Sequence, residues 1–113
     1  QHELILFASN GEPKPLTTHD KSNIVRVSNI QSNNRVHPTQ KPIEVLRYLV
    51  SSSSSEGDVV FDPMCGSGSA LCAAKQLGRH YLGIEISPDY VKISKEQLDL
   101  IQSPFKWIKE EKA

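Results

Sequence analysis

The feature that most constrains the fold is a short apolar run that ends in an acid and continues into a glycine turn. Residues 59–61 are Val-Val-Phe, which is typical of a parallel strand buried on both faces, and Asp62 follows at the carboxyl end. The next residues are Pro63-Met-Cys-Gly-Ser-Gly68, and a helical pattern begins at Ser69. A strand, a glycine turn and a helix in this order predict the first half of a strand-helix-strand unit.

The rest of the downstream sequence continues the alternation of helices and strands. Pro42 suits the first position of a helix of about ten residues, which we expect the serines at 51–55 to end. A helix is predicted at 69–77, a strand at 81–86, and a helix from Pro88, capped by Ser87, up to Ser103-Pro104. This order predicts an α/β protein with a doubly wound parallel sheet.

The upstream third of the chain has a different character. Residues 4–8 are apolar and are followed by Ser9-Asn10-Gly11, which predicts a strand from a sheet that begins further upstream. Residues 12–34 are polar, with one candidate strand at 24–28, and we interpret the remainder as loop. Because the chain opens at Gln1, close to the predicted strand, we expect it to be a fragment whose upstream part is absent.

Length, charge and cysteine content limit the classes of protein to which this chain can belong. A chain of 113 residues fits one small domain. Thirteen basic and thirteen acidic residues leave no formal net charge, so any contact with DNA is expected to be local. No apolar run approaches the ~20 residues of a membrane span and no segment resembles a secretory signal, which predicts a cytoplasmic protein without a membrane span. Cys65 and Cys72 lack zinc-site spacing, so we expect reduced thiols in the core or a loop, and no metal.

A ligand site is predicted where the two strands end. Gly66 and Gly68 allow backbone to approach a ligand closely, although a Gly-x-Gly turn alone is equally consistent with a purely structural turn. Glu85 lies 23 residues after Asp62, near the end of the next predicted strand, where a carboxylate can bond ribose hydroxyls. The pair favours a nucleotide-type or adenosyl ligand. A nicotinamide cofactor is disfavoured because the third glycine of its fingerprint is missing.

Longer motifs carry a family resemblance. They are His37-Pro-Thr-Gln-Lys-Pro42, the Asp-Pro, Gly and Ser-Gly positions of 62–68, Leu-Gly-Arg79, Gly83-Ile-Glu85 and Pro-Asp-Tyr90. Together they resemble the site-specific DNA methyltransferases that modify the exocyclic amine of adenine or cytosine, in the subgroup whose cofactor motifs follow the catalytic motif. The resemblance covers residues 37–101.

The resemblance implies a Rossmann-like methyltransferase fold with part of a doubly wound sheet and flanking helices. Residues 1–36 are then the end of an upstream sheet region and a polar loop, and residues 37–113 the S-adenosylmethionine-binding region. It also implies DNA as partner of the full-length protein and a bacterial or phage origin. Thr39 and Lys41 are expected at the methionine end of the cofactor, and Glu85 at its ribose. The implied cofactor-binding residues are His37, Thr39, Lys41, Asp62, Met64, Gly66, Ser67, Gly68 and Glu85.

Two departures from the family pattern matter. Met64 stands where the family usually carries Phe, and methionine can fill an apolar slot adaptably. The catalytic tetrapeptide, an Asp, Asn or Ser followed by two prolines and an aromatic residue, does not occur, so no catalytic residue is assigned.

Two interpretations remain open at this point. The chain is either the cofactor-binding carboxyl-terminal part of a DNA methyltransferase, inactive by itself, or a non-catalytic remnant that serves as an interaction or scaffold module. A partial sheet leaves an edge and apolar faces uncovered, which also predicts self-association of the fragment.

Overall fold

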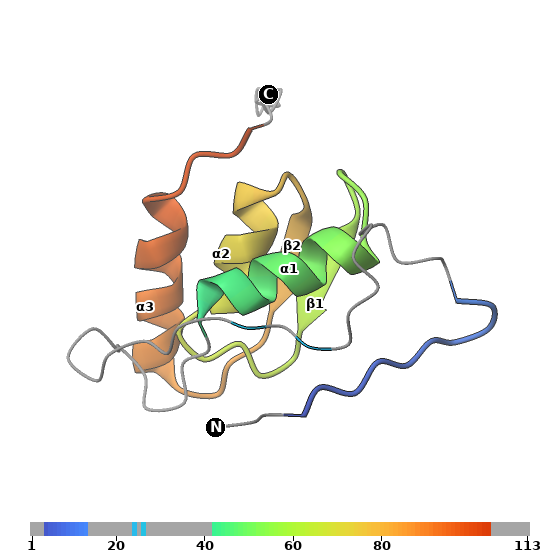
Figure 1. Ribbon diagram of the computed structural model, residues 1–113. Helices are drawn as coiled ribbons and strands as arrows, with labels where there is room; N and C mark the ends of the chain where they lie inside the picture. Colours follow the sequence, from blue (N-terminus) through green and yellow to red (C-terminus); the bar gives the residue numbers. More distant parts are fainter. Residues whose placement is uncertain (1–3, 14–23, 25, 27–41, 105–113) are drawn as a thin grey trace, which may run out of the picture.

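The computed structural model describes residues 4–13, 24, 26 and 42–104, and these residues contain three helices and two strands (Figure 1). In chain order the elements are α1 (Ile43–Ser53), β1 (Val59–Asp62), α2 (Ser69–Gln76), β2 (His80–Gly83) and α3 (Pro88–Asp99). The predicted order of helix, strand, helix, strand, helix is therefore confirmed. No helix in the described part of the chain has the length and apolar character needed to span a membrane.

The two strands pair in parallel, with α2 as the connection between them. Val59 lies opposite His80, and Asp62 lies opposite Gly83 at the other end of the ladder. The pairing continues just beyond the strands, because the Ile84 N–H donates to the Asp62 carbonyl over 3.0 Å. A parallel pair places both carboxyl ends at one edge of the sheet, so the segments that carry Asp62 and Glu85 leave the sheet together.

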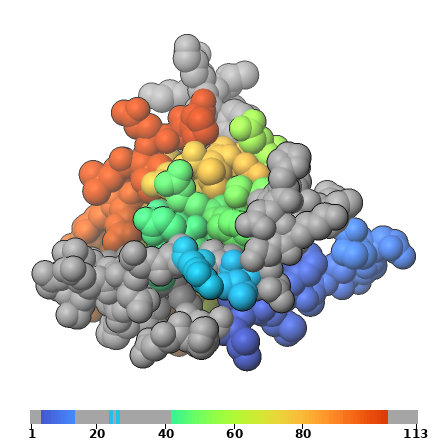
Figure 2. Space-filling view, in the orientation of Figure 1, coloured from blue at the N-terminus to red at the C-terminus, as the bar shows by residue number. Residues whose placement is uncertain are grey.

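The helices gather around α2. This helix contacts both strands, and α1 and α3 each pack against it (Figure 1). Figure 2 shows the side of the molecule on which α1 (green), α2 (yellow) and α3 (orange) lie. The small residues of α2 allow close approach of its neighbours, and burial of its apolar surface stabilises the fold. The buried apolar residues are Val50, Leu71, Cys72, Ala73 and Ala74.

The prediction that the first strand is buried on both faces is wrong. Val59 and Phe61 are 65% and 54% exposed, and Leu82 on the neighbouring strand is 57% exposed. All three side chains lie on the same face of the sheet, because they alternate with the half-buried Val60 and Tyr81. The described helices pack around α2 on the opposite face, so the apolar composition of β1 is not matched by burial here.

The predicted end of the helix holds for α1 but not for α3. As predicted, α1 ends inside the serine run, at Ser53, and three serines there donate their hydroxyls to carbonyls one turn earlier. The last helix ends earlier than predicted, at Asp99, where the chain closes with short turns that involve Leu100 and Ile101.

The predicted strand at residues 4–8 is not found. This segment has no strand assignment, and Leu4 and Leu6 are 98% and 91% exposed. A strand needs a hydrogen-bonded neighbour, and among the described residues only β1 and β2 pair, with each other. The candidate strand at 24–28 lies mostly outside the described residues; Ile24 and Arg26, which are described, have no strand assignment.

Arg79 forms a buried hydrogen-bonded cluster at the amino end of the sheet. Its side chain is only 7% exposed, and its guanidinium donates to the Ser54 hydroxyl over 2.9 Å, to the Ser54 carbonyl over 2.6 Å and to the Leu77 carbonyl over 2.7 Å. These bonds join the end of α1 to the turn between α2 and β2. A buried guanidinium needs such acceptors, so Arg79 of the Leu-Gly-Arg motif has a structural role in this fold.

Candidate functional site

Asp62 begins the turn at the carboxyl end of β1. Its side chain is half-buried, and its Oδ1 accepts a hydrogen bond from the Met64 N–H over 3.1 Å. This bond is the local kind that aspartate forms with backbone two residues ahead in a turn. It directs the chain into residues 63–68, which we call the glycine loop.

The glycine loop closes with two residues in left-handed conformation. Gly66 has φ of 53° and Gly68 has φ of 88°, values that side-chain-bearing residues rarely adopt. The Gly68 N–H donates to the Cys65 carbonyl over 2.8 Å, and the Gly68 carbonyl accepts from the Cys72 N–H over 2.8 Å at the start of α2. No side chain caps this helix, so its first amide groups lack the usual side-chain acceptor.

On the side where a Cβ would project, Gly68 packs against protein. A Cβ added there would lie 2.8 Å from the Ser94 hydroxyl and 3.0 Å from its Cβ. Close packing of α3 against the glycine loop is therefore a second reason for a glycine at this position, beside the predicted approach of a ligand to the bare backbone, which stays a prediction. Gly68 therefore fits the site for two physical reasons, its backbone angle and its protein neighbour.

Gly83 has a similar role on the second strand. A Cβ at this position would lie 2.5 Å from the Leu71 Cδ1 and 2.9 Å from the Cys65 Sγ. The Cys65 N–H donates to the Ile84 carbonyl over 2.9 Å, which fixes the glycine loop against the segment after β2. The Gly-Ile-Glu motif thus begins with a glycine because the loop and α2 approach β2 too closely for a side chain.

The two acids come together near Cys65. Burial raises the pKa of the Cys65 thiol, the Asp62 carboxylate raises it further, the Ser94 hydroxyl opposes the rise, and the Glu85 carboxylate adds to it. Backbone hydrogen bonds bring the segments of the two acids together: the Ile84 N–H donates to the Asp62 carbonyl over 3.0 Å, and the Ile84 carbonyl accepts from the Cys65 N–H over 2.9 Å. Glu85 directly follows the residue that makes both bonds. The pKa of Cys72 is also raised, chiefly by burial, with Lys75 opposing the rise.

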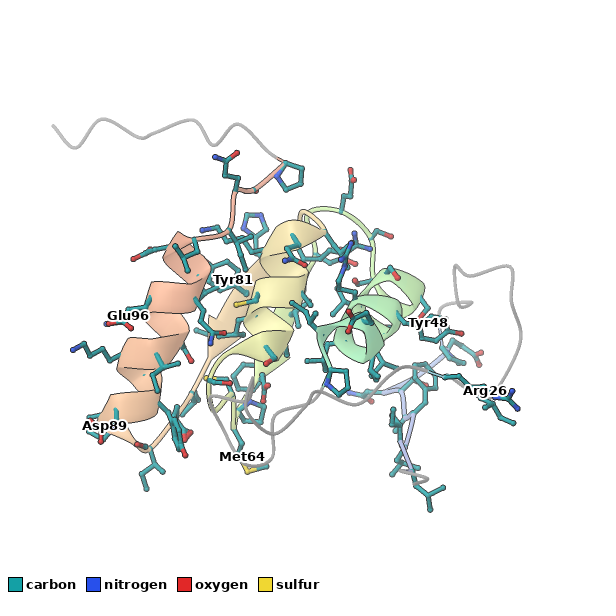
Figure 3. All side chains as sticks on the ribbon, turned by 60° about the vertical axis from the view of Figure 1, so that its left-hand side comes forward. Arg26, Tyr48, Met64, Tyr81, Asp89 and Glu96 are labelled. Atoms are coloured by element: carbon teal, nitrogen blue, oxygen red, sulfur yellow. The ribbon has the colours of Figure 1, made fainter. Side chains whose placement is uncertain are left out.

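Six of the nine predicted site residues lie within the described chain, and the structure brings them to one end of the sheet. Glu85 lies two residues beyond the last residue of β2 rather than inside the predicted strand. Met64 is 84% exposed and extends outward from the glycine loop (Figure 3). The predicted residues His37, Thr39 and Lys41 lie outside the described residues.

The chemistry of this arrangement suits a polar ligand with hydroxyl groups and one apolar part. Two carboxylates can accept hydrogen bonds from adjacent hydroxyls, the uncapped start of α2 offers donors, and Met64 offers an exposed apolar surface. The described residues include no group of three or more His, Cys, Asp or Glu side chains that is arranged to hold a metal ion.

One residue at the site was not identified from the sequence. Ser94 of α3 is 5% exposed, and its hydroxyl donates to the Gly66 carbonyl over 2.7 Å. A signal was present, because Ser94 falls three residues after Val91 and four before Leu98, on the same helical face. A polar residue on an apolar face is an informative exception that points to a specific partner.

Comparison with known proteins shows the family to which the chain belongs. Residues 1–96 match the N6_N4_Mtase family, described as DNA methylase. A loop between two acids at the carboxyl edge of a parallel sheet fits the Rossmann-like fold of methyltransferases. The chain belongs to the DNA methylase family.

Individual relatives agree with this assignment. The chain is 40% identical over 81 residues to the type II methyltransferase M.HpaI of Haemophilus parainfluenzae, a match that covers 69% of this chain and 26% of M.HpaI. It is 43% identical over 63 residues to the type II methyltransferase M2.DpnII of Streptococcus pneumoniae, covering 56% of this chain and 24% of that protein. The chain therefore spans about a quarter of the length of these relatives.

Solved structures show the same fold. The complex of M1.HpyAVI with SAM matches 77% of this chain and 45% of its own, with a TM-score of 0.64 and 29% identity. TTHA0409 from Thermus thermophilus, solved with S-adenosyl-L-methionine, matches 51% of this chain and 24% of its own, with a TM-score of 0.51 and 43% identity.

Proposed function

We propose that this chain is the S-adenosylmethionine-binding part of a DNA methyltransferase that transfers a methyl group to the exocyclic amine of adenine or cytosine. The observation that carries the proposal is that the segments of Asp62 and Glu85 meet at the glycine loop, where Ile84 bonds both the Asp62 carbonyl and the Cys65 N–H. Membership of the DNA methylase family and the two cofactor complexes among similar structures support it.

Each of these residues would hold a different part of the cofactor. The Glu85 carboxylate would accept hydrogen bonds from the ribose hydroxyls, and the backbone of Gly66 to Gly68 would lie along the ligand. Met64 would provide an apolar contact at the position where the family usually has Phe. Lys41 would neutralise the carboxylate of the methionine end and Thr39 would bond it; both residues lie outside the described chain. When bound, the cofactor supplies the sulfonium methyl group.

The methyl acceptor and its positioning come from outside this chain. Transfer to an exocyclic amine needs a group that holds the target base in line with the methyl group, and the tetrapeptide that performs this role in the family does not occur in the sequence. We therefore propose that DNA is a partner of the whole protein and that the chain alone binds cofactor without turning it over.

Titration calorimetry of the chain with S-adenosylmethionine and with S-adenosylhomocysteine tests the proposal. We expect weak binding of both at one site, because the loop and both acids are present, and no binding of NAD at the same concentrations. No heat with millimolar cofactor from a chain that shows a folded circular dichroism spectrum would contradict it. That outcome would favour the alternative, a non-catalytic remnant that acts as an interaction module.

We also propose that the isolated chain self-associates through its uncovered sheet face. Val59, Phe61 and Leu82 are each more than half exposed on that face, next to the exposed Ile84. Exposed apolar side chains that lie together favour association in water. Light scattering is expected to show a mass above the monomer that falls for Phe61→Ser. A clean monomer at high concentration would contradict self-association.

A further inference from the structure

The contacts of Ser94 connect the two segments that carry the acids of the site. Ser94 lies in α3, which begins three residues after Glu85, and its hydroxyl bonds the Gly66 carbonyl over 2.7 Å across a separation of 28 residues. The same side chain occupies the space beside Gly68. One side chain thus touches the glycine loop at two positions.

The burial of this hydroxyl is explained by its bond to the glycine loop. A serine inside a helix usually faces solvent or bonds a carbonyl one turn earlier in its own helix, as Ser52 does in α1. Ser94 is 5% exposed, and its hydroxyl donates to a different segment instead. Burying a hydroxyl is unfavourable unless it is bonded, so the bond to Gly66 is the interaction that compensates for its burial.

This bond fixes the direction of a whole peptide group. The Gly66 carbonyl and the Ser67 N–H belong to one planar trans peptide, so they point in opposite directions. When Ser94 holds the carbonyl toward α3, the Ser67 N–H must point away from α3. Gly66 has φ of 53° and glycine resists rotation less than any other residue, so this peptide needs an outside contact to keep one orientation.

We propose that Ser94 is a positioning residue for the cofactor: its hydroxyl holds the Gly66–Ser67 peptide, and with it the glycine loop, in the orientation that binds the ligand. The proposal rests on the proposed function, because it assigns the glycine loop to S-adenosylmethionine. It extends that function by adding a residue from α3, outside the glycine loop and the acids, to the determinants of affinity.

The test compares Ser94→Ala with the matched control Ser52→Ala. Both replace a buried helical serine, 5% and 4% exposed, that donates to a backbone carbonyl, but only Ser94 contacts the glycine loop. Affinity for S-adenosylmethionine is measured by calorimetry, folding by urea titration, and the amide signals of Ser67 and Gly68 by NMR without ligand. Ser94→Thr, which keeps the hydroxyl, tests rescue.

We expect Ser94→Ala to weaken cofactor binding roughly five- to tenfold, the effect of about one hydrogen bond, and to shift the Ser67 and Gly68 amide signals. Ser52→Ala is expected to change neither, and Ser94→Thr to restore the amide signals where it folds. An unchanged affinity in Ser94→Ala, or an equal loss in Ser52→Ala, would overturn the proposal.

The ligand-free NMR measurement separates this proposal from the proposed function. If the unsubstituted chain binds no cofactor, the proposed function fails, and with it the part of this proposal that concerns the ligand. Altered Ser67 and Gly68 amides in Ser94→Ala would still show that Ser94 orients the peptide. Unaltered amides would overturn that orienting role whether or not cofactor binds.

Discussion

The two ends of the short sheet differ in how their polar groups are bonded. At the amino end, the polar groups bond within the protein: the buried Arg79 guanidinium donates hydrogen bonds to three acceptors, and the Gly57 N–H donates to the Gly78 carbonyl over 2.9 Å. At the carboxyl end, Asp62 and Glu85 are half-buried beside a glycine loop and near one thiol. The Leu-Gly-Arg motif therefore has a structural role at one end, and the Gly-Ile-Glu motif leads to the candidate site at the other.

The largest effect is expected from breaking the amino end. Arg79→Ala leaves the carbonyls of Ser54 and Leu77 without their donor, and we expect unfolding to become easier by about 2–4 kcal/mol. Urea denaturation followed by circular dichroism measures this change. Arg79→Lys, which keeps the charge but loses the forked geometry, is expected to fall in between. A stable Arg79→Ala variant would remove the contrast between the two ends.

A second variant tests how closely the carboxyl end is packed. Gly83→Ala places a methyl group 2.5 Å from Leu71, so we expect a loss of about 1–3 kcal/mol and a weaker cofactor complex. Gly57→Ala is the control at the other end, since Gly57 has φ of 86° but no atom within 4 Å of an added Cβ. Unaltered cofactor affinity in folded Gly83→Ala would contradict the dependence of the site on this packing.

The third prediction separates binding from stability. Glu85→Gln keeps the shape of the side chain but loses the charge, so we expect about tenfold weaker S-adenosylmethionine binding, the effect of one charge-assisted hydrogen bond. Stability is expected to stay within about 0.5 kcal/mol because the side chain is only half-buried. This prediction fails if affinity is unchanged, or if the variant loses stability to the extent expected of Arg79→Ala.

The smallest effect concerns the ionisation of Cys65. Because the pKa of Cys65 is raised, the native thiol stays neutral to higher pH than a thiol of the unfolded chain. Alkylation of Cys65 by iodoacetamide therefore sets in at higher pH in the folded protein. The contribution of the neutral thiol to stability is lost as the pH rises through this raised pKa. Asp62→Asn removes a neighbouring negative charge, which lowers the pKa and speeds alkylation at about pH 8 by roughly two- to threefold.

Cys72, at 3% exposure, is expected to react only after unfolding, and Cys72→Ala removes its signal from the assay. Equal alkylation rates for the unsubstituted chain and Asp62→Asn would show that the acid does not act on the thiol.

Much of this architecture follows from local sequence. Residues 59–61 predict a strand because they are apolar and precede an acid and glycines, and β1 forms there. Ser87 predicts the start of α3, and its hydroxyl accepts from the Tyr90 N–H over 3.4 Å. These signals act over a few residues, so no tertiary contact is needed to interpret them.

Other features depend on contacts that sequence does not show. The exposure of Phe61 depends on which face of the sheet the helices cover. The role of Ser94 depends on α3 meeting a loop 28 residues away. The assignments of His37, Thr39 and Lys41 to the cofactor site stay predictions, since these residues lie outside the described chain.

The most direct test of the central claim is an NMR titration of the isotope-labelled chain with S-adenosylmethionine, which observes both ends of the sheet at once. We predict that the amide signals of Met64, Gly66, Ser67, Gly68 and Glu85 shift progressively with cofactor, while those of Gly57, Gly78 and Arg79 stay in place. Shifts confined to the Arg79 end, or no shifts from a folded chain at millimolar cofactor, would contradict the claim.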